Sequence, residues 1–96
     1  MEKFGEWLHR VRRAQDMTLE TLAKKTESHK GYYSGIECGS LMPPSPKVIR
    51  RLAKVFGEDV KTLLLMSWVE KAPEELKPML EADYNTLWHQ IIGRRR

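Results

Sequence analysis

The stretch that most constrains the fold of this chain runs from Thr18 to Gly39 and reads TLETLAKKTESHKGYYSGIECG. Thr18 precedes a run of good helix formers, and its hydroxyl can accept a hydrogen bond from an N–H group of the first helical turn. We therefore expect a helix to begin at Thr18. Residues 26–29 are polar and mostly poor helix formers, so this helix should end there and the chain should turn.

A second short helix is expected after the turn. It should begin at about residue 29 or 30 and end at Cys38, with Tyr33 and Ile36 three residues apart on one face. Gly39 follows where helices often end in the left-handed conformation, which glycine adopts without strain. The stretch therefore predicts two helices joined by a short turn, a helix-turn-helix.

Apolar residues recur at helical spacing on both sides of this motif. Before it, we expect a helix over about residues 4–15. After it, Ser45 followed by Pro46 predicts the start of a helix that ends at Gly57. Asp59 then predicts the cap of a further helix. The apolar side chains expected to face the core are Phe4, Trp7, Leu8, Val11, Ala14, Val48, Ile49, Leu52, Ala53, Phe56, Val60, Leu63, Leu64 and Trp68.

The length of 96 residues and the hydrophobic content of 41% suffice for one domain with a modest core and a short appendage. The single cysteine, Cys38, excludes an intrachain disulfide, and no apolar run approaches the roughly 18 residues of a membrane span. The N-terminal stretch lacks the apolar core of a signal peptide. We therefore expect a cytoplasmic protein.

No arrangement typical of an enzyme or a metal site occurs in the sequence. The three histidines, His9, His29 and His89, show no i, i+4 spacing, and one thiol without convergent ligands predicts neither zinc binding nor a nucleophile. A glycine-rich phosphate loop and a pair of carboxylates suited to acid–base chemistry are also missing. We therefore expect no enzymatic activity, no metal and no cofactor.

Three segments of the chain, TLETLAKK, KGYYSGIECG and PPSPKVIRRLAKVFG, together resemble the phage-repressor-like (Cro/C1, XRE) helix-turn-helix domain. The resemblance covers about residues 4–66. It implies an all-α fold, a five-helix lambda-repressor-like domain, to which this chain adds a C-terminal amphipathic helix. In that family the second helix of the motif lies in the DNA major groove, and dimers read two half-sites about one helical turn apart.

The resemblance also implies which residues contact DNA. The base-facing positions of the family fall on residues 29–32 and 35, and two of these five are glycine. Because glycine has no side chain that can hydrogen-bond a base, direct readout is left to His29, Lys30, Tyr32 and Ser34. Groups at the ends of the motif and cations of the following helix are candidates for phosphate contacts. The full set is Thr18, His29, Lys30, Gly31, Tyr32, Ser34, Gly35, Ser40, Lys47 and Arg50.

Further expectations follow from the same resemblance. Arg12 and Glu37 occupy positions that form an ion pair in the family, and such a pair can fix the register of a helix crossing. The turn glycine of the family is Glu27 in this chain, and a common phosphate-contacting glutamine is Leu19. Apart from the resemblance, the spacing of apolar residues in the helix after Pro46 predicts that its cationic side chains face solvent: Lys47, Arg50, Arg51 and Lys54.

A polar connector with two prolines, EKAPEELKP, precedes the C-terminal residues. We expect a domain over residues 1–70 and a connector with an amphipathic helix over residues 71–96. The apolar stripe of that helix must bury, either against its own domain or against the same helix of a second chain. We favour the dimer, because the five-helix unit is complete without this helix. The proposed dimerisation residues are Leu80, Tyr84, Leu87, Trp88 and Ile91.

These patterns predict a sequence-specific DNA-binding transcriptional regulator, most simply a repressor, that binds operator DNA as a homodimer. Residues 9–54 carry ten Lys and Arg against four Asp and Glu, and such a surplus favours a polyanionic partner. The alternative is a protein-interaction module, or an antitoxin-type regulator that uses the same fold to bind a protein partner. The two glycines in the base-facing set, Leu19 and the apolar loop SLMPPSP favour this alternative.

Overall fold

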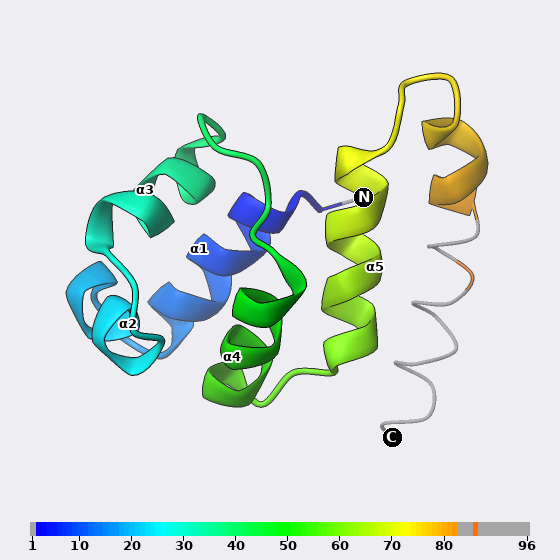
Figure 1. The fold of residues 1–96 in the computed structure, drawn as a ribbon. Helices are drawn as coiled ribbons and strands as arrows, with labels where there is room; N and C mark the ends of the chain where they lie inside the picture. The colour runs from blue at the N-terminus through cyan, green and yellow to red at the C-terminus, as the bar shows by residue number, and fades with distance from the viewer. Residues whose placement is uncertain (1, 83–85, 87–96) are drawn as a thin grey trace.

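The structure, a computed structural model, describes residues 2–82 and 86, and in these residues it is built from helices without a strand (Figure 1). The five main helices are α1 (Phe4–Ala14), α2 (Leu19–Lys25), α3 (Lys30–Cys38), α4 (Pro46–Phe56) and α5 (Val60–Lys71). A shorter helical segment covers residues 77–82. The expected all-α fold is confirmed, and α1 ends one residue earlier than we expected.

The core lies where α1, α3, α4 and α5 meet. α1 packs against α3 and α5, α2 packs against α3, and α4 packs against α5. Trp7 sits at the centre, with its ring centroid 5.2 Å from that of Phe4 and 5.9 Å from that of Phe56. The buried apolar side chains are Phe4, Trp7, Leu8, Val11, Leu22, Ala23, Tyr33, Ile36, Ile49, Leu52, Ala53, Phe56, Leu63, Met66 and Val69.

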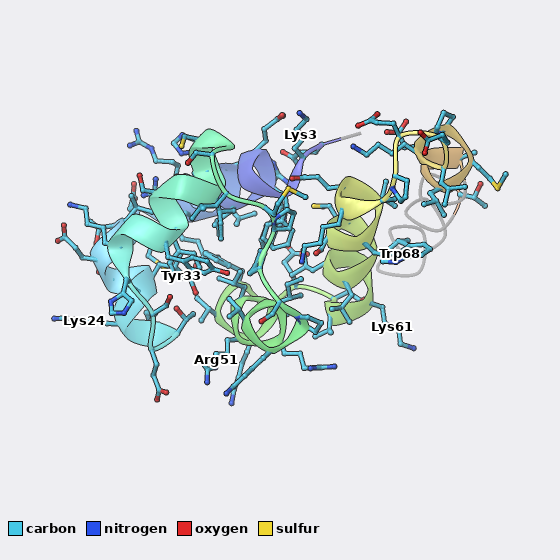
Figure 2. All side chains as sticks on the ribbon, turned by 45° about the horizontal axis from the view of Figure 1, so that its top comes forward. Lys3, Lys24, Tyr33, Arg51, Lys61 and Trp68 are labelled. Atoms are coloured by element: carbon cyan, nitrogen blue, oxygen red, sulfur yellow. The ribbon has the colours of Figure 1, made fainter. Side chains whose placement is uncertain are left out.

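Two residues expected in the core lie outside it. Trp68 has 58% of its surface exposed, because α5 turns Met66 and Val69 inward and Trp68 follows Met66 by about 200° around the helix. Ala14 is exposed because α1 ends there, and Met17 packs against the core after the turn. Figure 2 shows Trp68 projecting from α5 on the side away from α4.

Helix ends follow the predicted signals in most places. The Thr18 hydroxyl accepts a hydrogen bond from the Thr21 N–H, and the Asp59 carboxylate accepts one from the Thr62 N–H. Gly39 and Gly57 are left-handed, with φ of 85° and 66°. These contacts and angles satisfy backbone groups that each helix end would otherwise leave unpaired.

The ends of α1 and α2 use left-handed residues that are not glycine. Asp16 has φ of 50° and Glu27 has φ of 54°. After Glu27, the Ser28 N–H donates to the Ala23 carbonyl at 2.8 Å, the hydrogen bond that closes a Schellman motif. The turn of the helix-turn-helix therefore has the geometry that a glycine would favour, built with a glutamate.

The start of α1 is paired by a residue far away in the sequence. The Phe4 N–H donates to a carboxylate oxygen of Glu70 at 2.9 Å, whereas Lys3 at the cap position makes no side-chain hydrogen bond. A carboxylate at a helix N-terminus also interacts favourably with the helix dipole. Glu70, the first residue of the polar stretch EKAPEELKP, lies in α5 and ties the first helix to the fifth.

After α5 the chain reverses, and the segment 77–82 lies beside the C-terminal end of α5 (Figure 1). Leu80 is half-buried and packs against the core of its own domain, whereas Leu76 and Met79 are exposed. The other proposed dimerisation residues lie outside the described residues: Tyr84, Leu87, Trp88 and Ile91. In the part of the chain that the structure describes, no helix combines the length and hydropathy needed to cross a membrane.

Candidate nucleic-acid interface

The orientation of α3 is set by buried contacts on its inner face. Tyr33 and Ile36 are buried, and the Tyr33 hydroxyl donates to Thr26 Oγ1 at 2.6 Å. The Thr26 hydroxyl in turn donates to the Leu22 carbonyl at 2.8 Å. This buried relay joins α3 to the end of α2. In the sequence, Thr26 stands out only as a polar residue of the turn.

The C-terminal part of α3 is held to α1 by an ion pair. Arg12 Nε donates to Glu37 Oε2 at 2.7 Å, and Arg12 Nη2 donates to Glu37 Oε1 at 3.0 Å. Only 10% of the Arg12 side chain and 9% of the Glu37 side chain are exposed. Arg12 Nη1 also donates to the Met17 carbonyl at 2.8 Å. The expected pair is therefore present, and one guanidinium links α1, α3 and the turn before α2.

The protonation states of the pair follow from these contacts. Burial alone would raise the pKa of Glu37, but hydrogen bonds from Arg12 and His9 outweigh it and lower that pKa below its ordinary value. The hydrogen bond to Glu37 likewise raises the pKa of Arg12. His9 Nδ1 lies 3.0 Å from Glu37 Oε1. The carboxylate is thus held ionised by two neighbours on α1.

Residues on the N-terminal half of α3 form the outward face of the motif. His29, Lys30, Gly31 and Ser34 are exposed. Tyr32 is half-buried, its ring centroid lies 5.3 Å from that of Tyr33, and burial raises the pKa of its hydroxyl. A neutral tyrosine hydroxyl can still donate or accept a hydrogen bond. The outward face of α3 is therefore exposed and able to enter a groove, while buried contacts hold its inner face in place.

A helix-turn-helix family profile matches residues 8–63, more than half of the chain. The chain belongs to the Cro/C1-type (XRE) helix-turn-helix family. The matched region runs from within α1 into α5 and contains the whole of α2, α3 and α4.

The helix-turn-helix chain is also similar to a protein of Bacillus subtilis (strain 168) that is described as an uncharacterized HTH-type transcriptional regulator, RghRB. The two are 30% identical over 82 residues, which cover 84% of this chain. The chain spans 59% of the length of that relative. The search of solved structures gave no match.

One cation of the helix-turn-helix surface is paired with a carboxylate. Lys30 Nζ lies 3.0 Å from a carboxylate oxygen of Glu20, and both side chains are largely exposed. Glu20 lies in the first turn of α2, beside the outward face of α3. An acidic residue in the first turn of a helix is common because of the helix dipole, so the sequence gives no signal that Glu20 pairs with Lys30. The pair places one negative charge next to Lys30, the lysine at the start of α3.

The middle of α3 is covered by the loop that follows it. A Cβ atom built on Gly35 would lie 2.6 Å from Leu41 Cδ1 and 2.8 Å from Leu41 Cγ. The Leu41 N–H donates to the Gly35 carbonyl at 3.1 Å. The side of Gly35 that lacks a side chain therefore faces Leu41. Ser40 also bonds to this turn, donating from Oγ to the Gly35 carbonyl at 3.3 Å.

The remaining candidates for phosphate contacts lie at two separate places. Thr18 is exposed, but its hydroxyl caps α2 and donates to Thr21 Oγ1 at 3.0 Å. Lys47 and Arg50 are exposed on α4. Arg51, which we expected in solvent, is half-buried and donates from Nη1 to the Thr26 carbonyl at 3.0 Å. Arg51 is thus a structural link between α4 and the turn of the motif.

Proposed function

We propose that this protein is a sequence-specific DNA-binding transcriptional regulator, most simply a repressor that occludes a promoter. The observation that carries the proposal is the N-terminal half of α3. Its outward face is exposed, and buried contacts hold its inner face. It lies inside the region that matches the helix-turn-helix family. The relative described as a transcriptional regulator supports the same reading. The basic surplus of residues 9–54 supplies attraction to phosphates.

In the proposed complex, α3 lies in the major groove with its N-terminal half towards the base edges. The side chains available for base contacts are His29, Lys30, Tyr32 and Ser34. Lys47 and Arg50 on α4, with groups near Thr18 and Ser40, contact phosphates. Phosphate contacts set affinity and register, whereas base contacts set the sequence that is read.

We further propose that the protein binds operators as a homodimer, since two-fold symmetry lets two copies of α3 read a palindrome. The proposed interface is the apolar stripe of the C-terminal helix. Leu80 packs on its own domain, so the proposed contacts with a second chain fall to the other residues of the stripe. Exposed Trp68 on α5 offers further apolar surface for such an interface.

The proposal is tested by selection from a random-sequence pool of duplex DNA at two salt concentrations, followed by sequencing. The expected result is an enriched two-fold symmetric motif whose binding weakens as salt rises. Binding that depends on salt but enriches no sequence would contradict specific readout. Absence of binding at both salt concentrations would remove the DNA-binding proposal as a whole.

A second candidate function, that of a protein-interaction module or antitoxin-type regulator, is favoured by one observation. Leu41 and Met42, in the loop after α3, have 45% and 57% of their surfaces exposed. Exposed apolar side chains beside a recognition helix suit a protein surface better than a phosphate backbone. If this function holds, Met42→Glu should abolish partner binding in pull-downs with the purified partner and leave DNA binding in place.

A further inference from the structure

Among the glycines that the structure describes, Gly31 in the first turn of α3 is the one that the fold does not explain. Within residues 2–82 and 86, two other glycines make room for neighbours. A Cβ atom on Gly5 would run into the backbone carbonyl of Ile36 where α1 crosses α3, and a Cβ atom on Gly35 would collide with Leu41. Both positions lack a side chain because something inside the molecule occupies the space.

Two more described glycines are required by backbone conformation. Gly39 and Gly57 end α3 and α4 with positive φ, where residues with a Cβ atom are strained. Gly31 belongs to neither group. Its φ lies outside the positive range of these two residues, and a Cβ atom built on it would have no atom within 4 Å. An alanine would fit there and would favour the helix.

The position of Gly31 on the outward face of α3 indicates why a side chain is absent there. Gly31 is exposed, follows Lys30 and lies three residues before Ser34, so it shares the outward face of α3 with Ser34. A surface that approaches this face meets side chains on either side and bare backbone at Gly31. The free space therefore opens outwards, towards whatever binds α3.

We infer that Gly31 is a close-approach position of the DNA interface, where the bare backbone of α3 lies directly against the duplex. The inference rests on the proposed function and adds a specificity-determining position to it. A methyl group at this place would hold α3 further from the groove. Hydrogen bonds from Lys30 and Ser34 to base edges would then lengthen, and such bonds weaken steeply with distance and misalignment.

The test compares Gly31→Ala with the wild-type chain. The probes are the duplex that the wild type enriches from the random pool and a shuffled duplex of equal length and composition. Gly31→Ala should melt at the same temperature as the wild type or higher, because the substitution fits the fold. Its Kd for the enriched duplex should rise by roughly tenfold or more, while its Kd for the shuffled duplex stays close to that of the wild type.

Gly31→Lys distinguishes two explanations for the bare position. Either the backbone lies directly against the duplex and leaves no room for a side chain, or water fills a gap between them. An added cation strengthens binding to any duplex through counterion release. Close approach predicts that Gly31→Lys binds the shuffled duplex more tightly and the enriched duplex more weakly. Glu75→Gln, which raises the net charge by one through removal of a carboxylate at an exposed position after α5, is the matched control and should not weaken binding to the enriched duplex.

Two results would overturn the inference while DNA binding itself stands: wild-type affinity of Gly31→Ala for the enriched duplex, or tighter binding of that duplex by Gly31→Lys. A wild-type chain that enriches no duplex would instead overturn the proposed function, and the role of Gly31 with it. The two failures are distinguished by the wild-type measurement alone.

Discussion

At the scale of single residues, the Arg12 guanidinium links α1 to α3 and to the turn before α2. It donates to both carboxylate oxygens of Glu37 and to the carbonyl of Met17. Two parallel hydrogen bonds to one carboxylate fix geometry as well as charge. Desolvation offsets much of the attraction in such a pair, so its main effect is to specify how α1 crosses α3.

Removing both members of the pair should cost less than the two single removals added together. Arg12→Met should lower the free energy of unfolding by about 3 kcal/mol, because the buried Glu37 carboxylate loses its cation. The double variant Arg12→Met with Glu37→Leu should lose less than the sum of the two single losses. Urea denaturation of all four proteins measures the cycle, and strictly additive losses would show that the pair is not coupled.

The same pair should make stability depend on pH in acid. The pKa of Glu37 is lowered in the folded chain, so the unfolded chain binds this proton at a higher pH than the folded chain does. The contribution of Glu37 is therefore complete at neutral pH. It should disappear as the pH falls below the ordinary glutamate pKa of about 4.3 and through the lowered folded value.

The measurement is the difference in unfolding free energy between the wild type and Glu37→Gln from pH 7 down to pH 3. That difference should shrink steadily in the acid range. A difference that is constant with pH would mean that the charge of Glu37 contributes nothing and that only its shape is needed.

At the scale of elements, the turn between α2 and α3 has the hydrogen bonds of a glycine-ended helix without the glycine. Glu27 adopts a φ of 54°, and the Ser28 N–H still reaches the Ala23 carbonyl. A left-handed residue with a Cβ atom carries a steric cost that glycine avoids. The buried relay from Tyr33 through Thr26 holds the turn in this conformation.

Glu27→Gly should therefore stabilise the domain by about 1 kcal/mol, since it relieves the left-handed strain and leaves the hydrogen bonds in place. Thermal unfolding measures the change. Glu27→Ala is the matched control, because it removes the same charge but keeps a Cβ atom. Equal behaviour of the two variants would assign the effect to the charge and not to the backbone.

The ion pair between α2 and α3 predicts a change in DNA binding. Glu20→Gln frees Lys30 for the duplex and removes a negative charge from the interface. Affinity for the enriched duplex should rise, and the plot of log K against log salt should steepen by up to about 0.9, the value for one more cation that displaces a counterion from the duplex. Glu75→Gln supplies the control for overall charge, and an identical slope in both variants would show that Glu20 does not restrain Lys30.

At the scale of the whole molecule, local signals predicted the helices and their ends. Thr18, Gly39, Gly57 and Asp59 act within one helical turn of their own positions, so the sequence is enough to assign them. Contacts between distant elements were not accessible in this way. The outward turn of Trp68 and the bond from Arg51 to Thr26 depend on where neighbouring helices lie.

In the candidate site, too, some features could be predicted from the sequence and others could not. The family resemblance identified the outward residues of α3 and the pair of Arg12 with Glu37. The cover that Leu41 places over Gly35 and the pairing of Glu20 with Lys30 arise from side chains of other elements folding onto α3. Spacing within one helix carries no signal for such contacts.

Assembly of the whole molecule should depend on the C-terminal stripe. Leu87→Glu combined with Ile91→Glu should sediment as a monomer and bind the enriched duplex more weakly, because one chain reads one half-site. Met79→Glu, at an exposed position on the preceding segment, is the control and should remain dimeric. A double variant that still sediments as a dimer would place the interface elsewhere.

The placement of the tryptophans gives the protein its own optical reporters. Trp7 is buried between Phe4 and Phe56, whereas Trp68 is largely exposed on α5. In a Trp88→Phe background, acrylamide should quench the emission of Trp68 readily and that of Trp7 very little until the core opens. A single fluorescence titration can therefore follow two events without a label. The quenching of Trp68 reports whether the α5 surface is covered, and the quenching of Trp7 reports whether the core has opened.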